Sequence, residues 1–234
     1  ENKNAEKIFD QQNILSTIIG LGSESVSDKS SIDHRIELAK NSLAKDPSSS
    51  NLERELTRLK NLQSISHYYD SAREFAKIVS RQNQKEHCNS HVIVTGGGPG
   101  IMEAANRGAF DADCKSIGLN ISLPNEQHPN AYITPGLCFK FNYFALRKFH
   151  FVMRSVAAVF FPGGFGTFDE LFELLTLRQT GMKTEIPIIL FGRDYWSKVI
   201  NFQFLSDHGL ISDEHMNLFQ YADSASEAWD IIKQ

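Results

Sequence analysis

The sequence predicts an α/β fold in which a parallel sheet is covered by helices on both faces. From residue 91 onward, short apolar segments alternate with segments of helical periodicity, which is typical of repeated strand–helix units. The longest apolar runs, 156–161 and 186–191, suit strands buried on both faces. No internal repeat or separate second domain is visible. These observations favour one α/β domain.

The N-terminal part departs from this alternation. Residues 1–13 are polar, and we expect a frayed tail. An apolar stretch, 14–21, predicts the first strand, and the single domain is expected to span 14–234. A polar insert at about 23–65 is expected to carry extra helices, because apolar residues recur there at helical spacing. Three such stripes are Ile32, Ile36, Ala39 and Leu43; Leu52, Leu56, Leu59 and Leu62; and, after the insert, Tyr68, Ala72, Phe75 and Val79.

Beyond residue 91 the expected elements follow in regular order. Strands are expected at 91–95, 116–123, 156–161, 186–191 and 218–221, and helices at 101–112, 140–154, 168–178, 195–205 and 225–233.

Charge and cysteine content exclude several classes of protein. The net charge of −4 argues against a general nucleic-acid binder, which is normally basic. The apolar runs are too short to span a bilayer. Three distant cysteines, Cys88, Cys114 and Cys138, form no CxxC pair, so neither a metal site nor a disulfide framework is expected. A reducing, cytoplasmic location fits best, although a chain that starts at Glu1 says nothing about an upstream targeting segment.

Two segments share one plan of strand, glycine-rich turn and helix. The first contains Gly96, Gly97, Gly98 and Gly100, and the second contains Gly163, Gly164, Gly166 and Thr167. Glycines let backbone N–H groups approach an anion, and a helix N-terminus adds partial positive charge. Each loop alone could be a mere tight turn. Two loops at the carboxyl edge of one sheet favour a phosphate-binding site.

The familiar nucleotide-binding fingerprints do not match these loops. A dinucleotide motif that starts at Gly96 requires glycine where Ile101 stands, and a P-loop requires lysine where Met102 stands. A monophosphate is the simpler ligand. A dinucleotide oxidoreductase is therefore disfavoured.

The motif residues resemble the LONELY GUY (LOG) family. The resemblance covers roughly residues 91–234 and is carried by the run from Gly96 to Ala109, by Arg147-Lys148 and by the run from Pro162 to Glu170. It implies a Rossmann-like phosphoribohydrolase of cytokinin riboside 5′-monophosphate or a related nucleotide 5′-monophosphate nucleosidase. It also implies a dimer or higher oligomer and no organic cofactor. The polar insert at 23–51 departs from the family pattern.

The resemblance assigns catalysis to Arg147 and Glu170. A carboxylate near the anomeric carbon stabilises positive charge on ribose or orients the attacking water. The alternative is structural, because Thr167 and Glu170 have the spacing of a capping box. Arg147 lies on a helical stripe that contains Tyr143, His150 and Arg154. For His150 and Arg154 a solvated or interfacial basic stripe is favoured.

Other candidates have weaker support. Lys148 is grouped with the nucleotide-binding residues on the family pattern, yet it lacks the context of a Schiff-base lysine, so a decarboxylase is set aside. Met102 and the segment His128-Pro129-Asn130, in a loop that also contains Glu126 and Gln127, could touch the base, although core packing or solvent exposure is the commoner role. Asp169 is expected to be solvated.

The sequence therefore predicts a hydrolase that cleaves the N-glycosidic bond of a nucleoside 5′-monophosphate. The alternative is a nucleotide-binding carrier or sensor without catalytic activity. The preferred base stays open between adenine, prenylated adenine and others. A homodimer at least is expected, because the segment around 140–154 carries more phenylalanines than one side can bury: Phe139, Phe141, Phe144, Phe149 and Phe151.

Overall fold

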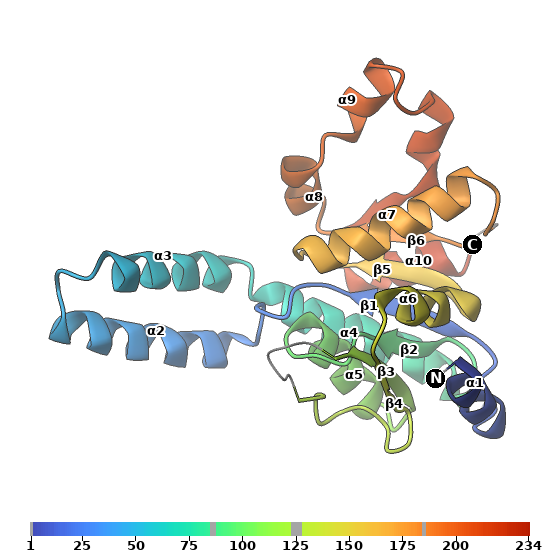
Figure 1. Cartoon of the computed structure of the whole chain (residues 1–234), viewed down its shortest axis with the longest axis horizontal. Coiled ribbons are helices and arrows are strands. Elements are labelled where there is room, and N and C mark those ends of the chain that lie inside the picture. The colour runs from blue at the N-terminus through green and yellow to red at the C-terminus, as the bar shows by residue number, and fades with distance from the viewer. Residues whose placement is uncertain (1, 85–87, 123–127, 184–185) are drawn as a thin grey trace.

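The computed structural model describes residues 2–84, 88–122, 128–183 and 186–234. Within them a seven-stranded sheet has the order β4-β3-β2-β1-β5-β6-β7, and every neighbouring pair is parallel (Figure 1). The strands are β1 Thr17–Leu21, β2 Val92–Thr95, β3 Ser116–Ile121, β4 Cys138–Phe141, β5 Ser155–Phe160, β6 Ile188–Phe191 and β7 Gln220–Ala222. The chain builds outward from β1 to β4 and then returns to β5, so the topological switch point lies between β1 and β5.

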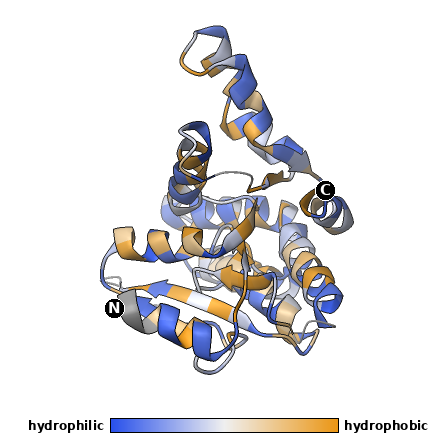
Figure 2. Cartoon of the chain, turned by 90° about the vertical axis from the view of Figure 1, so that its right-hand side faces the viewer, coloured by the Kyte–Doolittle hydropathy of each residue, from blue (hydrophilic) through white to orange (hydrophobic). Residues whose placement is uncertain are grey.

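Helices cover both faces of the sheet, which confirms the predicted fold class. Alternate strand residues point to opposite faces: Ile19 packs in one core with α1, α6, α7, α8 and α9, whereas Ile18 packs in the other with α4, α5 and α10. Figure 2 shows the matching pattern of hydrophobic and hydrophilic residues on the helices. The helices are α1 Asn2–Gln11, α2 Lys29–Lys45, α3 Ser50–Ser64, α4 His67–Gln82, α5 Ile101–Phe110, α6 Phe144–Met153, α7 Phe165–Gln179, α8 Arg193–Val199, α9 Phe202–Asp207 and α10 Ala225–Ile232, with a 3₁₀ turn at Asp213–Leu218.

The expectation of a frayed tail at residues 1–13 is wrong. Asn2–Gln11 form α1, and its Ala5 and Phe9, four positions apart, are buried in the core. Glu6 bonds both His150 and Arg154. The segment is polar in composition but apolar along one face, and that face is enough to dock it.

The polar insert contains the two expected helices. α2 and α3 form a hairpin that projects from the body of the molecule (Figure 1). Their contact is a small apolar cluster of its own, built from Ile32, Ile36, Ala39 and Leu59. The hairpin begins at Lys29, four residues after Ser25, which lines the main cavity described below.

The single helix expected at 140–154 is wrong, because the segment divides into β4 and α6. Phe139 pairs with Leu119, and Phe141 pairs with Ile121. Phe141 is buried while Lys140 is exposed, the two-residue alternation of a half-buried strand. The helix expected at 195–205 likewise divides into α8 and α9, because Asn201 caps α9 by accepting from the Phe204 N–H.

A disulfide joins Cys88 to Cys114, with 5.5 Å between their Cα atoms. The expectation that no disulfide forms is therefore wrong, because the fold brings together loops before β2 and β3 that lie 26 residues apart. The argument for a reducing compartment loses its support. Among the described residues, no helix has the length and apolar character needed to cross a membrane.

Candidate active site

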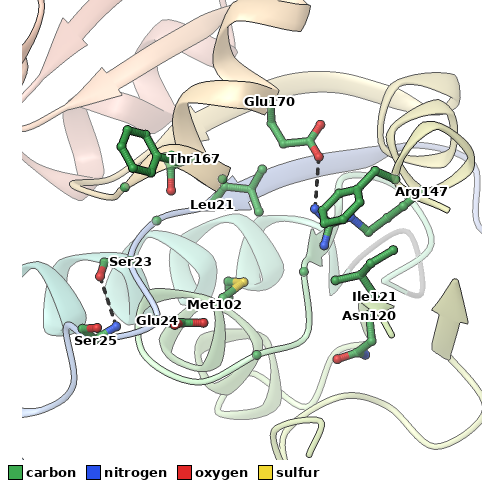
Figure 3. A pocket seen from close by; sticks show the side chains of 17 residues that line it. Leu21, Ser23, Glu24, Ser25, Met102, Asn120, Ile121, Arg147, Thr167 and Glu170 are labelled. Carbon is green, nitrogen blue, oxygen red and sulfur yellow. Dashed lines mark hydrogen bonds and ion pairs between the residues drawn. The ribbon is translucent and has the colours of Figure 1, made fainter. Parts of the chain in front are cut away.

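A cavity of about 430 Å³ opens at the carboxyl edge of the sheet, beside the switch point (Figure 3). Its size falls in the range of small-molecule sites. Loops after β1, β2, β3 and β5 and the first turns of α5, α6 and α7 supply its walls. The lining residues are Leu21, Gly22, Ser23, Glu24, Ser25, Gly96, Gly98, Met102, Asn120, Ile121, Phe144, Arg147, Gly164, Phe165, Gly166, Thr167 and Glu170.

The first glycine loop contributes Gly96 and Gly98 to the wall, whereas Gly97 and Gly100 face protein. Gly97 has φ +74°, and a Cβ there would lie 2.8 Å from the Cγ of Asn120. Gly100 has φ +69°, and its Cβ would lie 2.6 Å from the carbonyl oxygen of Glu24. These two glycines are required by the packing of the protein itself.

The second glycine loop is more open. Gly164 and Gly166 line the cavity, and a Cβ at either would meet no atom within 4 Å. Gly163 lies outside the wall and packs against Thr167, while its carbonyl accepts a hydrogen bond from the Tyr195 hydroxyl. α7 begins at Phe165, and the N–H groups of Thr167 and Phe168 donate to the carbonyl of Gly164, the N-cap residue. Of the two loops, this one leaves more open space beside its glycines.

Glu170 lies on α7 and is only 4% exposed. Burial raises the pKa of its carboxyl to about 7, and the nearby charges of Arg147 and Lys148 offset part of that rise. Its Oε1 lies 3.3 Å from a terminal guanidinium nitrogen of Arg147. A carboxyl group with this pKa exchanges protons near neutral pH, which is a property of catalytic acids and bases.

Arg147 projects from α6 toward Glu170 across the cavity (Figure 3). Its guanidinium lies 5.1 Å from the ring centroid of Phe144 and 5.7 Å from that of Phe151. Its Nε is buried and has no hydrogen-bond partner within the described residues. A buried donor without a partner costs free energy, so the guanidinium retains capacity for a ligand.

The capping-box interpretation of Thr167 and Glu170 is wrong. The N-cap of α7 is Gly164, so Thr167 is the third residue of the helix and Glu170 the sixth. The helix begins earlier than the sequence suggested, because the glycine loop itself starts it. Glu170 therefore has no capping role that would explain its burial.

Several expected positions lie away from the cavity. Lys148 does not line it; its ammonium is 2.7 Å from Asp169 and 2.9 Å from Glu173. Asp169 is half-exposed but paired rather than simply solvated. The solvated interpretation of His150 is wrong, because its side chain is fully buried and its Nδ1 lies 3.1 Å from Glu6.

The loop expected to touch the base has a different role. The Asn130 amide donates to the carbonyls of Gly97 and Gly98 and to Asn106, so it braces the first glycine loop. His128 is exposed and outside the cavity wall. Glu126 and Gln127 lie outside the described residues. Met102, by contrast, does line the cavity.

The sequence did not indicate five of the polar or aromatic residues in the wall. They are Glu24, Ser25, Asn120, Phe144 and Phe165. Glu24 and Asn120 carried a usable signal, since each is a polar residue at or just after the carboxyl end of a buried strand. Among the described residues, no group of three or more His, Cys, Asp or Glu side chains is arranged to hold a metal ion.

A family model and several curated proteins match more than half of the chain. The family model described as possible lysine decarboxylase matches residues 102–232, more than half of the chain. Cytokinin riboside 5′-monophosphate phosphoribohydrolase LOG2 of Arabidopsis thaliana is 24% identical over 71% of this chain and 76% of its own length. Cytokinin riboside 5′-monophosphate phosphoribohydrolase LOG1, also from Arabidopsis thaliana, is 27% identical over 68% of this chain and 72% of its own length.

Solved structures share the fold at lower identity. The X-ray structure of the structural-genomics target TM1055 has a TM-score of 0.55 at 17% identity and covers 94% of this chain and 99% of its own. A molybdenum cofactor binding protein from Rippkaea orientalis has a TM-score of 0.51 at 20% identity, over 71% of this chain and 86% of its own. At these identities the likeness concerns the fold alone.

Proposed function

The chain belongs to the family described as possible lysine decarboxylase, the family of the LOG proteins, and on this premise we propose that it hydrolyses nucleoside 5′-monophosphates. The bond cleaved is the N-glycosidic bond, and the products are the free base and ribose 5-phosphate. Adenosine monophosphate or cytokinin riboside 5′-monophosphate is the proposed substrate. No resident cofactor or metal takes part in the proposal.

The observation that carries this proposal is the buried pair of Arg147 and Glu170 in the wall of a cavity bounded by two glycine loops. Cleavage of the glycosidic bond builds positive charge on the ribose ring. The Glu170 carboxylate, when ionised, stabilises that charge and accepts a proton from water. The water oxygen bonds to the anomeric carbon as the bond from that carbon to the base nitrogen breaks. The proton that Glu170 took from water passes through solvent to the departing base nitrogen, which regenerates the carboxylate.

Arg147, which lies beside Glu170 in the cavity wall, supplies hydrogen-bond donors to the same reaction. Its planar fork has donors beyond the one directed at Glu170, and they suit either the phosphate or the departing base. The N-terminus of α7, with Gly164, Gly166 and Thr167, is the proposed phosphate site.

A lysine decarboxylase, by contrast, has no support in this cavity. A pyridoxal enzyme requires a lysine free to form a Schiff base in the site. Lys148 is held by two carboxylates and lies outside the cavity wall. The family description therefore does not carry over to the chemistry we propose.

Chromatography of reaction mixtures tests the proposal. We expect free adenine and ribose 5-phosphate from AMP, with far slower release from adenosine, which lacks the phosphate. A panel of other nucleoside monophosphates would define the base preference. If AMP binds and is recovered unchanged, the chain is a carrier or sensor instead. If adenosine is hydrolysed as fast as AMP, the proposed phosphate site is wrong.

We also propose a homodimer or higher homo-oligomer. Phe141 and Phe151 are buried, whereas Tyr143, Phe144, Phe149 and Met153, on and beside α6, are exposed large hydrophobic residues. Light scattering that shows a monomer over working concentrations would contradict the assembly. The predicted cytoplasmic location stays a prediction, which cell fractionation tests.

A further inference from the structure

The loop after β1 ties the two glycine loops together. The Ser23 N–H donates to the Pro162 carbonyl, at 2.9 Å, where the second glycine loop begins. The Ser23 carbonyl accepts from the Ile101 N–H, at 3.0 Å, where the first loop enters α5. The Ser25 N–H closes a local turn on the Ser23 hydroxyl at 3.0 Å. The backbone of Glu24 is therefore fixed between both loops.

Close packing restricts this loop further. Gly100 lies directly against the backbone of Ser23 and Glu24, with no room for a side chain. Val26, which follows the turn, is buried in the core. Figure 3 shows the Glu24 side chain directed toward Met102 and the interior of the cavity. The cavity thus has a second carboxylate, on a rigid support and separate from Glu170.

We propose that Glu24 recognises the ribose by accepting hydrogen bonds from its 2′ and 3′ hydroxyls, an inference that rests on the proposed function. A carboxylate only accepts hydrogen bonds and repels a phosphate, so the ligand group beside it must be a donor. In the proposed function, the phosphate accepts hydrogen bonds at the N-terminus of α7, and the glycosidic bond lies beside Glu170 and Arg147. The ribose diol lies between these two ends of a nucleotide.

The chemistry of this pairing has a general precedent. An acidic residue near a glycine loop at the carboxyl edge of a parallel sheet commonly binds ribose hydroxyls. Glu24 is exposed at the cavity mouth, so water competes with the sugar for its oxygens. We therefore expect a preference for AMP over 2′-deoxy-AMP of about tenfold, the effect of one charge-assisted hydrogen bond at a wet site.

Calorimetric titration of AMP and of 2′-deoxy-AMP tests this inference. The titrations use the full chain with Glu170→Gln, so that the nucleotides are bound without turnover. Glu24→Ala and Glu24→Gln are compared with Glu53→Ala, a matched loss of an exposed glutamate on α3, a helix of the projecting hairpin (Figure 1) that contributes no residue to the cavity wall. We expect the Glu53→Ala chain to keep the tenfold preference, Glu24→Ala to reduce it to within about twofold, and Glu24→Gln to fall between them.

The outcomes separate this inference from the proposed function, because adenine release by the unaltered chain is measured in parallel. Adenine release together with a preference that Glu24→Ala leaves intact overturns the ribose-binding role alone. A preference that depends on Glu24, without adenine release, supports the ribose-binding role and overturns the hydrolase function. If the Glu53→Ala control binds both nucleotides equally, Glu24 has no role in recognising the 2′ hydroxyl and the inference is wrong.

Discussion

The two strand–glycine–helix units look alike in sequence but differ in what their glycines face. In the first unit, β2 to α5, Gly97 and Gly100 take positive φ and lie against Asn120 and the backbone of Glu24. The helix that follows is mostly core, with Ala104 and Ala105 buried. In this unit the glycines allow close contact between neighbouring parts of the protein.

In the second unit, β5 to α7, the glycines leave open space. A Cβ at Gly164 or Gly166 would meet no neighbour within 4 Å. The helix that follows presents Glu170 to the cavity rather than only to the core. From this difference we expect the first unit to have a structural role and the second to bind the ligand, and the free space at the glycines is what distinguishes them.

The largest expected effect concerns the arginine opposite the second unit. Arg147→Ala should lower the rate of AMP hydrolysis by about 100- to 1000-fold, the scale for loss of one positioned donor. Arg147→Lys should not restore it, since a point charge lacks the planar fork. The stability loss should be only about 1 kcal/mol, from the contacts with Phe144 and Phe151.

The matched control for this change is Arg107→Ala. Arg107 belongs to the first unit and lies 5.2 Å from the Tyr132 ring centroid. Its loss should leave hydrolysis close to that of the unaltered chain. A large drop in melting temperature for Arg147→Ala, with activity kept per folded molecule, would reduce Arg147 to a packing role.

The glycines themselves test the comparison next. Gly100→Ala should destabilise the fold by about 3 kcal/mol or more, because it combines left-handed backbone strain with a collision. Gly166→Ala should keep or slightly raise the melting temperature, since alanine favours helix, while AMP binding weakens about tenfold as the methyl group obstructs the phosphate. Thermal melting and titration of both variants check this. Equal destabilisation by the two changes would erase the contrast between the loops.

The buried carboxyl group predicts an unusual dependence of stability on pH. The pKa of Glu170 is raised from 4.5 to about 7. Below pH 4.5 the group is protonated in both the folded and unfolded states, and as pH rises toward 7 the unfolded state loses its proton first. The folded state is therefore penalised by up to about 3 kcal/mol above pH 7, at about 1.4 kcal/mol per pKa unit.

Replacing this group should remove the penalty. The Glu170→Gln chain should be more stable than the unaltered chain at pH 8 and equal to it near pH 4. Urea unfolding at the two pH values measures the difference. The control Glu103→Gln, which weakens the hydrogen bond that Tyr69 donates at 2.8 Å, should slightly lower stability at both. If the free energy of unfolding of the Glu170→Gln chain differed from that of the unaltered chain by the same amount at both pH values, the pKa of Glu170 would not be raised.

The smallest expected effect concerns Lys148. Its charge lowers the pKa of Glu170 from outside the cavity, and it holds Asp169 and Glu173. Lys148→Ala should retain most activity at pH 8 but shift the acidic limb of the pH–rate profile upward by a fraction of a unit. If the Lys148→Ala chain lost AMP binding and its pH–rate profile did not shift, Lys148 would be a nucleotide-binding residue.

The sequence predicted the sheet and both glycine loops because these features are local. β4 was missed because the aromatic residues between Phe139 and Phe151 hide a change from strand to helix periodicity. Nor can local pattern show the Cys88–Cys114 disulfide or the burial of His150 against Glu6, since both join distant segments. Glu24 could have been found from its place just after the carboxyl end of β1, but the hydrogen bonds that tie Ser23 to both glycine loops are visible only in the structure.

The most direct test of the central claim compares the glutamates of the two units in one assay of adenine release from AMP. Glu170→Gln should bind AMP but release adenine more slowly by about 100-fold or more, because the amide cannot supply charge or accept a proton. Glu103→Gln, the corresponding change in the first unit, should release adenine at nearly the unaltered rate. Near-normal release by the Glu170→Gln chain would contradict the account, since the second unit would then hold no catalytic carboxylate.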